Sequence, residues 1–179
     1  KYRGGPAKVS VIASGFFGSI SGSAVANVIG TGTFTIPLMK KTGYEPETAA
    51  AVEAAASTGG QFTPPVMGAT AFLIAERLAL PYFDLVKAAA IPAVLYYASL
   101  LLSVDVYAQK NGLRGMSKEE IPKMRPLLRR LYLLSPLVFL VFILAVMGKT
   151  VARAGLYTIL LTLVIVMLDK KCRLTPEKL

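Results

Sequence analysis

Two uncharged stretches of this chain combine hydroxyl and amide side chains with glycine, and the second also contains two prolines. The oxygen-bearing side chains that they supply are Ser19, Ser21, Ser23 and Asn27 in residues 18–27, with Thr31 shortly after, and Thr58, Gln61 and Thr63 in residues 57–65. Glycine and proline weaken helices, so both stretches favour unwound backbone with unpaired carbonyl groups. Neutral oxygens of these kinds suit a monovalent cation such as Na⁺, whereas divalent ions normally require carboxylates.

The composition excludes several other kinds of site. The chain has no histidine, which removes hydrolytic triads and His-based zinc sites, and its single cysteine, Cys172, excludes an internal disulfide. Glu53 lies near the second stretch and leaves two interpretations open: a proton or cation site, or a residue that faces another helix or the inner interface.

The elements that carry these stretches are membrane helices. The 179 residues are 54% hydrophobic, with a mean hydropathy of +0.57, which is too apolar for an ordinary soluble domain. The net charge of +10 comes from basic clusters between apolar runs. Aromatic residues do not alternate with these basic residues, as they do in proteins that stack nucleic-acid bases, so we expect no nucleic-acid partner. We expect the basic clusters to set the orientation of the helices in the membrane. The chain begins with Lys1 and has no signal-like segment, so we expect a piece of a longer polytopic protein.

The first uncharged run, residues 9–39, has basic residues on both sides, with Lys8 before it and Lys40 and Lys41 after it. The positive-inside rule places both flanks in the cytoplasm, which a single crossing cannot satisfy. A re-entrant hairpin with its tip at Ser21-Gly22-Ser23 satisfies it, with arms of roughly 20 and 26 Å. The alternatives are one tilted helix, or small residues that only let helices pack closely.

A helix predicted from residue 45 to residue 56 stops at the second stretch, and apolar sequence resumes at Val66. Gly59-Gly60 and Pro64-Pro65 on the two sides of the stop favour a discontinuous helix over a simple proline kink. We hypothesise that both interruptions share one Na⁺. Gly60 would bind it through its carbonyl oxygen, and Ser23 would either bind it or instead cap the second helix of the hairpin. The proposed ligands are Ser21, Ser23, Asn27, Thr58, Gly60 and Thr63.

The rest of the chain alternates apolar and basic segments. We predict an outside loop at 76–87, a crossing at 88–104, and a basic cytoplasmic loop at 108–130 with a capping box and amphipathic helix from Ser117. Crossings at 131–147 and 155–168 follow on the two sides of an outside loop at 148–154, and we expect residues 151–154 to extend the second of these helices. The fold class is thus an all-α polytopic membrane protein. Its parts are the hairpin and broken helix (1–80), a transmembrane helix (81–107), the basic loop (108–130), and a helix pair with a cytoplasmic tail (131–179).

These motifs carry a family resemblance. Residues 20–28, 32–39 and 41–44, followed by Gly59-Gly-Gln-Phe-Thr-Pro-Pro-Val-Met-Gly-Ala69, resemble the large membrane subunit of tripartite ATP-independent periplasmic (TRAP) transporters, the fused permeases in particular. The resemblance implies sodium-driven uptake of an organic acid across the bacterial inner membrane by an elevator motion. A periplasmic binding protein would deliver the substrate, and no organic cofactor is implied.

The resemblance also implies that Na⁺ lies beside the substrate, which places Ser21, Gly22 and Ser23 at the substrate. The family builds its site from an inverted repeat, and this sequence contains no second Ser-Gly-Ser hairpin, so we expect half of such a site here. Two alternatives belong to other classes. One is an intramembrane enzyme with Ser21 or Ser23 as nucleophile and a lysine base, and the other is a purely structural membrane subunit. Na⁺-dependent solute uptake would separate the transporter from both.

Overall fold

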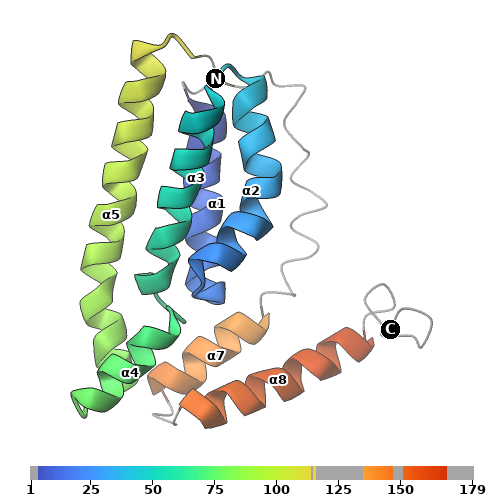
Figure 1. Cartoon of the computed structure of the whole chain (residues 1–179). Helices are drawn as coiled ribbons and strands as arrows, with labels where there is room; N and C mark the ends of the chain where they lie inside the picture. The colour runs from blue at the N-terminus through green and yellow to red at the C-terminus, as the bar shows by residue number, and fades with distance from the viewer. Residues whose placement is uncertain (1–3, 114, 116–134, 147–150, 169–179) are drawn as a thin grey trace. The chain divides into compact units, whose positions relative to one another are not determined.

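The computed structural model describes residues 4–113, 115, 135–146 and 151–168, and every regular element among them is helical. The chain divides into two compact units, residues 1–122 and 123–179. The first unit contains α1 (Gly5–Ser21), α2 (Ala24–Lys41), α3 (Pro46–Gly59), the 3₁₀ turn η1 (Gly60–Phe62), α4 (Ala69–Arg77) and α5 (Tyr82–Lys110), and the second contains α7 (Ser135–Val146) and α8 (Val151–Leu168) (Figure 1). The expectation of an all-helical chain is confirmed.

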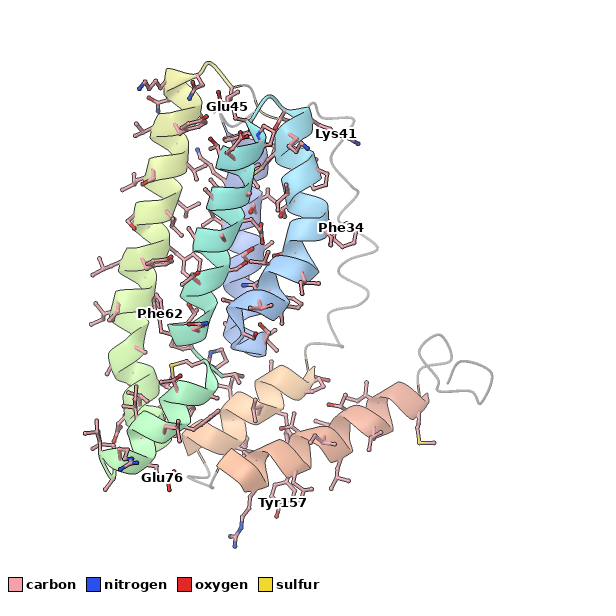
Figure 2. All side chains as sticks on the ribbon, viewed as in Figure 1. Phe34, Lys41, Glu45, Phe62, Glu76 and Tyr157 are labelled. Carbon is pink, nitrogen blue, oxygen red and sulfur yellow. The ribbon has the colours of Figure 1, made fainter. Side chains whose placement is uncertain are left out.

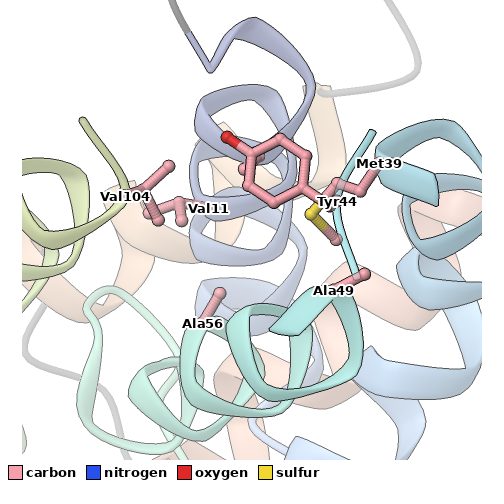
Figure 3. Close-up of a cluster of buried hydrophobic side chains, with 7 residues drawn as sticks. Val11, Met39, Tyr44, Ala49, Ala56 and Val104 are labelled. Atoms are coloured by element: carbon pink, nitrogen blue, oxygen red, sulfur yellow. The ribbon is translucent and has the colours of Figure 1, made fainter. Parts of the chain in front are cut away.

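In the first unit α1, α2 and α3 pack against one another, and α5 lies along α1 and α3 (Figure 1). Only Gly22 and Ser23 connect α1 to α2, so these two helices form an antiparallel pair. The buried apolar cluster lies between α1, α3, α5 and the end of α2, and most of its members are small (Figure 3). It consists of Ala7, Val11, Met39, Tyr44, Ala49, Ala56 and Val104. Small side chains let the helix backbones approach closely, as in membrane bundles.

The first unit places polar groups inside and large apolar groups outside. Ser10, Asn27 and Glu53 are fully buried, whereas Phe16 is 73% and Phe34 is 77% exposed. Phe34 points away from the helices, and the charged Lys41 and Glu45 lie at the opposite end of the unit from Glu76 (Figure 2). A water-soluble protein rarely exposes so many large apolar side chains while burying polar ones. This distribution fits helices surrounded by lipid or by further protein.

Among the described residues, α5 is the one helix that is long and apolar enough to cross a membrane, and a shorter apolar helical stretch covers Arg153–Leu163. Helix α5 begins at Tyr82, earlier than the predicted crossing at 88–104. The Tyr82 hydroxyl donates a hydrogen bond to the Val66 carbonyl, and its ring stacks on Phe72 with centroids 4.7 Å apart. Asp84 lies in the first turn, where the helix dipole favours an acid. The predicted loop at 76–87 is therefore shorter in the structure, because only residues 78–81 between α4 and α5 are not helical.

The interruption after α3 lies further along the chain than predicted. The sequence indicated a break at 57–65, but α3 continues to Gly59 and α4 starts at Ala69. Two hydroxyls bond back within α3: Ser57 to the Glu53 carboxylate at 3.3 Å, and Thr58 to the Ala54 carbonyl at 2.8 Å. These bonds let polar residues remain helical.

In the second unit α7 and α8 pack against each other and lie within or close to the predicted crossings at 131–147 and 155–168. Ile143 and Ala154 are buried there. The predicted capping box at Ser117 falls outside the described residues, as does most of the basic loop at 108–130.

Candidate cation and substrate site

The tip between α1 and α2 is a tight connection that needs glycine. Gly22 has φ 62°, a left-handed conformation that L side chains rarely adopt, and its N–H donates to the Gly18 carbonyl at 2.8 Å. Ser23 then caps α2, because its hydroxyl oxygen accepts a hydrogen bond from the Ala26 N–H at 3.3 Å. The hairpin tip therefore consists of two helix ends with short polar side chains and no large group.

The interruption after α3 is an irregular segment from Gly60 to Gly68. It contains one 3₁₀ turn, an extended Thr63, and Met67 at φ 58°. The Gly68 N–H donates to the Gln61 carbonyl at 2.6 Å, which draws the two ends of the segment together. This segment, and not a kinked helix, separates α3 from α4. It supplies the unwound backbone that could present carbonyl oxygens to a cation.

The hairpin tip and this irregular segment lie in direct contact. The Val66 N–H donates to the Ser19 carbonyl at 3.1 Å. A Cβ added to Gly18 would lie 2.6 Å from the Gly60 Cα, and one added to Gly22 would lie 1.9 Å from the Met67 carbonyl oxygen. Glycine is therefore required at positions 18 and 22, because the hairpin backbone there lies directly against the backbone of the irregular segment. The two interruptions that the sequence singled out form one locus.

The six proposed cation ligands occupy different places around this locus. Asn27 and Gly60 are buried, and both lie beside Gly18. Ser21 and Thr58 are exposed, and the Thr58 hydroxyl donates to its own helix. Ser23 acts as the cap of α2, and the Thr63 hydroxyl donates to the Gly59 carbonyl at 2.6 Å. The structure thus places Asn27 and Gly60 against the same glycine, with the Asn27 amide nitrogen on that side. Ser21 and Ser23 lie at the tip, and Thr58 is exposed.

The Asn27 amide has a defined orientation. Its Nδ2 donates to the Ser14 carbonyl at 2.8 Å, so Oδ1 faces the other way, toward the Thr31 hydroxyl at 3.2 Å. This hydrogen bond fixes which end of the amide is the oxygen. A buried amide oxygen turned toward a hydroxyl is a suitable pair of neutral ligands for a monovalent cation. The described residues contain no group of three His, Cys, Asp or Glu side chains that could hold a metal ion.

Glu53 stands at the centre of a hydroxyl cluster that the sequence reasoning did not find. Its carboxylate is fully buried between α1, α2 and α3 and accepts hydrogen bonds from five hydroxyls. The donors are Ser10 at 2.5 Å, Ser14 at 2.7 Å, Thr35 at 2.5 Å, Ser57 at 3.3 Å, and Thr31. The signal was present in the sequence, because Ser10 and Ser14, Thr31 and Thr35, and Glu53 and Ser57 each lie one helical turn apart.

The far end of the first unit is joined by polar contacts of another kind. Lys8 on α1 forms an ion pair with Asp105 on α5, and the Thr48 hydroxyl donates to the Tyr107 hydroxyl at 3.1 Å. Burial first, and then nearby Tyr107 and Asp105, raise the pKa of the Tyr44 phenol above its ordinary value, so Tyr44 stays neutral. The start of α1, the α2–α3 turn and the end of α5 therefore share one end of the unit.

Comparison with known proteins gives one family and several relatives. The family model of the DctM component of the tripartite ATP-independent periplasmic transporter matches residues 1–178. The C4-dicarboxylate TRAP transporter large permease protein DctM of Vibrio cholerae is 34% identical over 106 residues, which is 59% of this chain and 22% of that protein. The uncharacterized protein y4mL of Sinorhizobium fredii is 31% identical over 112 residues, 63% of this chain and 26% of that protein.

The uncharacterized protein YgiK of Salmonella typhimurium is 30% identical over 108 residues, 60% of this chain and 25% of that protein. The matched part of this chain thus covers about a quarter of the length of these curated relatives. No solved structure matches the chain.

Proposed function

Because this chain belongs to the DctM component family of tripartite ATP-independent periplasmic transporters, we propose that it forms part of the transport site of a sodium-driven importer of organic acids. The family is one of membrane permeases and not of enzymes, which removes the intramembrane serine enzyme from consideration. A C4-dicarboxylate is the first substrate to test, since the Vibrio cholerae relative carries that description. The proposed location is the bacterial inner membrane, in a multi-pass arrangement.

The observation that carries this proposal is the contact between the two interruptions. Residues 18–27 and 60–68 are far apart in the sequence, yet Gly18 meets Gly60 and the Val66 N–H bonds to the Ser19 carbonyl. Helix ends that meet at membrane depth are how secondary transporters build sites for ions and anionic substrates. The tip residues Ser21, Gly22 and Ser23 are proposed to contact the substrate. The six residues Ser21, Ser23, Asn27, Thr58, Gly60 and Thr63 are proposed to surround Na⁺.

We propose that α1 and α2 form a re-entrant hairpin that enters and leaves the membrane on the cytoplasmic side. The shared end formed by Lys8, residues 42–48 and Asp105 supports this placement, because the basic flanks of the hairpin lie there. Each helix of the pair is about 25 Å long at 1.5 Å per residue, which brings the tip deep into a hydrocarbon core of about 30 Å.

The remaining partners follow from the family. A periplasmic binding protein would deliver the organic acid, and a second, inverted hairpin would face this one across the substrate. The unit described here would move as one body in an elevator motion, which the close packing of α1, α2 and α3 supports. Residues 1–179 alone are therefore expected not to transport, because the site they form is open on one side.

The test of sodium coupling uses a permease that contains this segment, reconstituted in vesicles with its binding protein. Asn27→Ala removes a buried amide oxygen and is expected to raise the Na⁺ concentration for half-maximal uptake by roughly 5- to 150-fold, the scale of an unmet buried polar group. Thr58→Val is expected to have a smaller effect, since the Thr58 hydroxyl already bonds to Ala54. Thr33→Val, an exposed hydroxyl on α2, is the matched control.

Two outcomes would contradict the proposal. Uptake by the parent protein that does not respond to a Na⁺ gradient would remove sodium coupling. A well-folded Asn27→Ala protein that keeps the parent's Na⁺ dependence would show that the polar residues at the interruptions serve packing. No solute uptake by any form, with the binding protein present, would favour the structural membrane subunit instead.

A further inference from the structure

Thr31 holds a position between the proposed cation site and the buried carboxylate of Glu53. Its hydroxyl oxygen lies within hydrogen-bond distance of the Glu53 carboxylate, of the Asn27 carbonyl at 2.8 Å and of Asn27 Oδ1 at 3.2 Å. The Ser14 hydroxyl lies 3.0 Å away as well. A threonine hydroxyl has one hydrogen to donate and two lone pairs. Only one of these neighbours can therefore receive its hydrogen.

The charges around Thr31 decide where that hydrogen goes. A hydrogen bond to an ionised carboxylate is roughly twice as strong as one between neutral groups, so Thr31 donates to Glu53. Ser14 also donates to Glu53, at 2.7 Å, and has no second hydrogen for Thr31. The Thr31 oxygen and Asn27 Oδ1 then face each other at 3.2 Å with no hydrogen between them. Two lone-pair oxygens at this separation are placed as adjacent ligands of one cation.

No cationic side chain in the described part of the chain forms an ion pair with Glu53. Among the residues that the structure describes, the ion pairs are Lys8 with Asp105 and Lys87 with Asp84, and neither includes Glu53. Ser10, Ser14 and Thr35 donate to the carboxylate oxygens at 2.5–2.7 Å, so hydroxyl hydrogens already occupy the carboxylate on these sides. A cation attracted by Glu53 must therefore lie beyond this shell of hydroxyls, on the Asn27 side of Thr31.

We infer that Thr31 is a further ligand of the transported Na⁺, and that Glu53 is a positioning residue that orients the Thr31 hydroxyl and supplies the counter-charge. The inference rests on the sodium coupling proposed above. Gly32 is part of the arrangement, because a Cβ there would lie 3.1 Å from Glu53 Cγ and would press on the carboxylate-bearing side chain. The ion would then be bound by neutral oxygens of Asn27 and Thr31. The negative charge of Glu53 would lie behind the Thr31 hydroxyl, without direct contact between the carboxylate and the ion.

The test measures Na⁺ binding without transport. The melting temperature of the purified permease is followed as NaCl replaces choline chloride at constant ionic strength, because an ion that binds the folded state raises it. Thr31→Val and Glu53→Gln are each expected to raise the Na⁺ concentration for the half-maximal rise by roughly 5- to 150-fold. Thr31→Ser keeps the hydroxyl and is expected to stay within a few-fold of the parent.

Controls separate this role from a structural one. Glu47→Gln removes an exposed acid from the same helix as Glu53, and Thr33→Val removes an exposed hydroxyl from the same helix as Thr31; both should leave the Na⁺ response unchanged. In the Thr31→Val, Glu53→Gln double variant the loss should not exceed the larger single loss, because both changes act through one hydroxyl. If Glu53→Gln does not fold, the contrast between Thr31→Val and Thr31→Ser still decides the question.

The outcomes distinguish this inference from the proposed function. A parent protein whose melting temperature and uptake ignore Na⁺ would overturn both. A parent that responds to Na⁺, with Thr31→Val responding equally, would overturn the role of Thr31 and Glu53 alone and leave sodium coupling intact.

Discussion

Gly18 provides a sharp test of the contact between the hairpin and the interrupted helix. A methyl group at this position would lie 2.6 Å from the Gly60 Cα and 2.7 Å from Asn27 Nδ2. Ordinary carbon contacts lie at about 3.5–4.0 Å, so α1 and the irregular segment would have to separate by roughly 1 Å. Because the first obstacle is backbone, no side-chain rotation relieves it.

The size of the effect follows from three opposing contributions. Alanine is a better helix former than glycine by about 1 kcal/mol, which favours the substitution. Overpacking of a filled interior costs about 1–3 kcal/mol, and a disturbed hydrogen bond from Asn27 to the Ser14 carbonyl costs about 0.5–1.5 kcal/mol. Gly18→Ala should therefore lower the stability of the folded permease by about 2 kcal/mol, and it should also weaken Na⁺ binding, since Asn27 is displaced.

The assay compares melting temperature and Na⁺ half-saturation for the parent, Gly18→Ala and Gly155→Ala. A Cβ on Gly155 in α8 meets nothing within 4 Å, so this control should be neutral or slightly stabilising. Gly60→Ala makes the same clash from the other side, with the Gly18 Cα at 2.5 Å. The double variant should lose less than the sum of the single losses, because one separation relieves both clashes. If Gly18→Ala matches the parent in both measurements, the inferred contact does not exist.

Three further predictions follow from the first unit. Gly22→Ala should be more damaging than Gly18→Ala in the same melting assay, since it adds a left-handed backbone cost of about 1–2 kcal/mol to a clash with the Met67 carbonyl; equal stability would argue against the tip geometry. Lys8→Met should lower stability by only about 1 kcal/mol, because the pair with Asp105 is partly exposed and Gln109 also bonds to Asp105; a double-mutant cycle with Asp105→Asn that shows no coupling would contradict the pair. In a Cys172→Ser background, single cysteines at positions 5 and 42 should react from the cytoplasmic side and one at 79 from the outside; position 5 is half-buried and has room for a side chain. Opposite sides for 5 and 42 would exclude a re-entrant hairpin.

The sequence predicted the positions of local interruptions well, because glycine and proline act over a few residues. The end of α1 at Ser21 and the cap at Ser23 needed only the local pattern. The limits of the second interruption were less predictable. Ser57 and Thr58 favour loops in isolation, yet in the structure their hydroxyls bond within α3 and keep them helical. The early start of α5 depended on the contact between Tyr82 and Val66, which no local pattern contains.

The contact between Gly18 and Gly60 could not be predicted from either segment alone. Each glycine was visible as a helix-weakening residue, but which glycine meets which backbone depends on how α1 and α3 pack. The expectation that the two interruptions share a site came from their neutral oxygens and free backbone, together with the family resemblance. The structure adds which atoms meet, and it places Asn27 beside this contact while Thr58 lies at the surface.

The hydroxyl cluster around Glu53 shows how the periodicity of a membrane helix should be interpreted. In a soluble helix a stripe of polar residues one turn apart faces water, so the pairs Ser10 with Ser14 and Thr31 with Thr35 would indicate an exposed face. In lipid the same stripe must face protein, because unpaired polar groups in hydrocarbon are costly. Two such stripes on consecutive helices therefore require a common polar partner between them. The only acid in α3 beyond its first turn is Glu53, one turn before Ser57, and this is the residue on which both stripes converge.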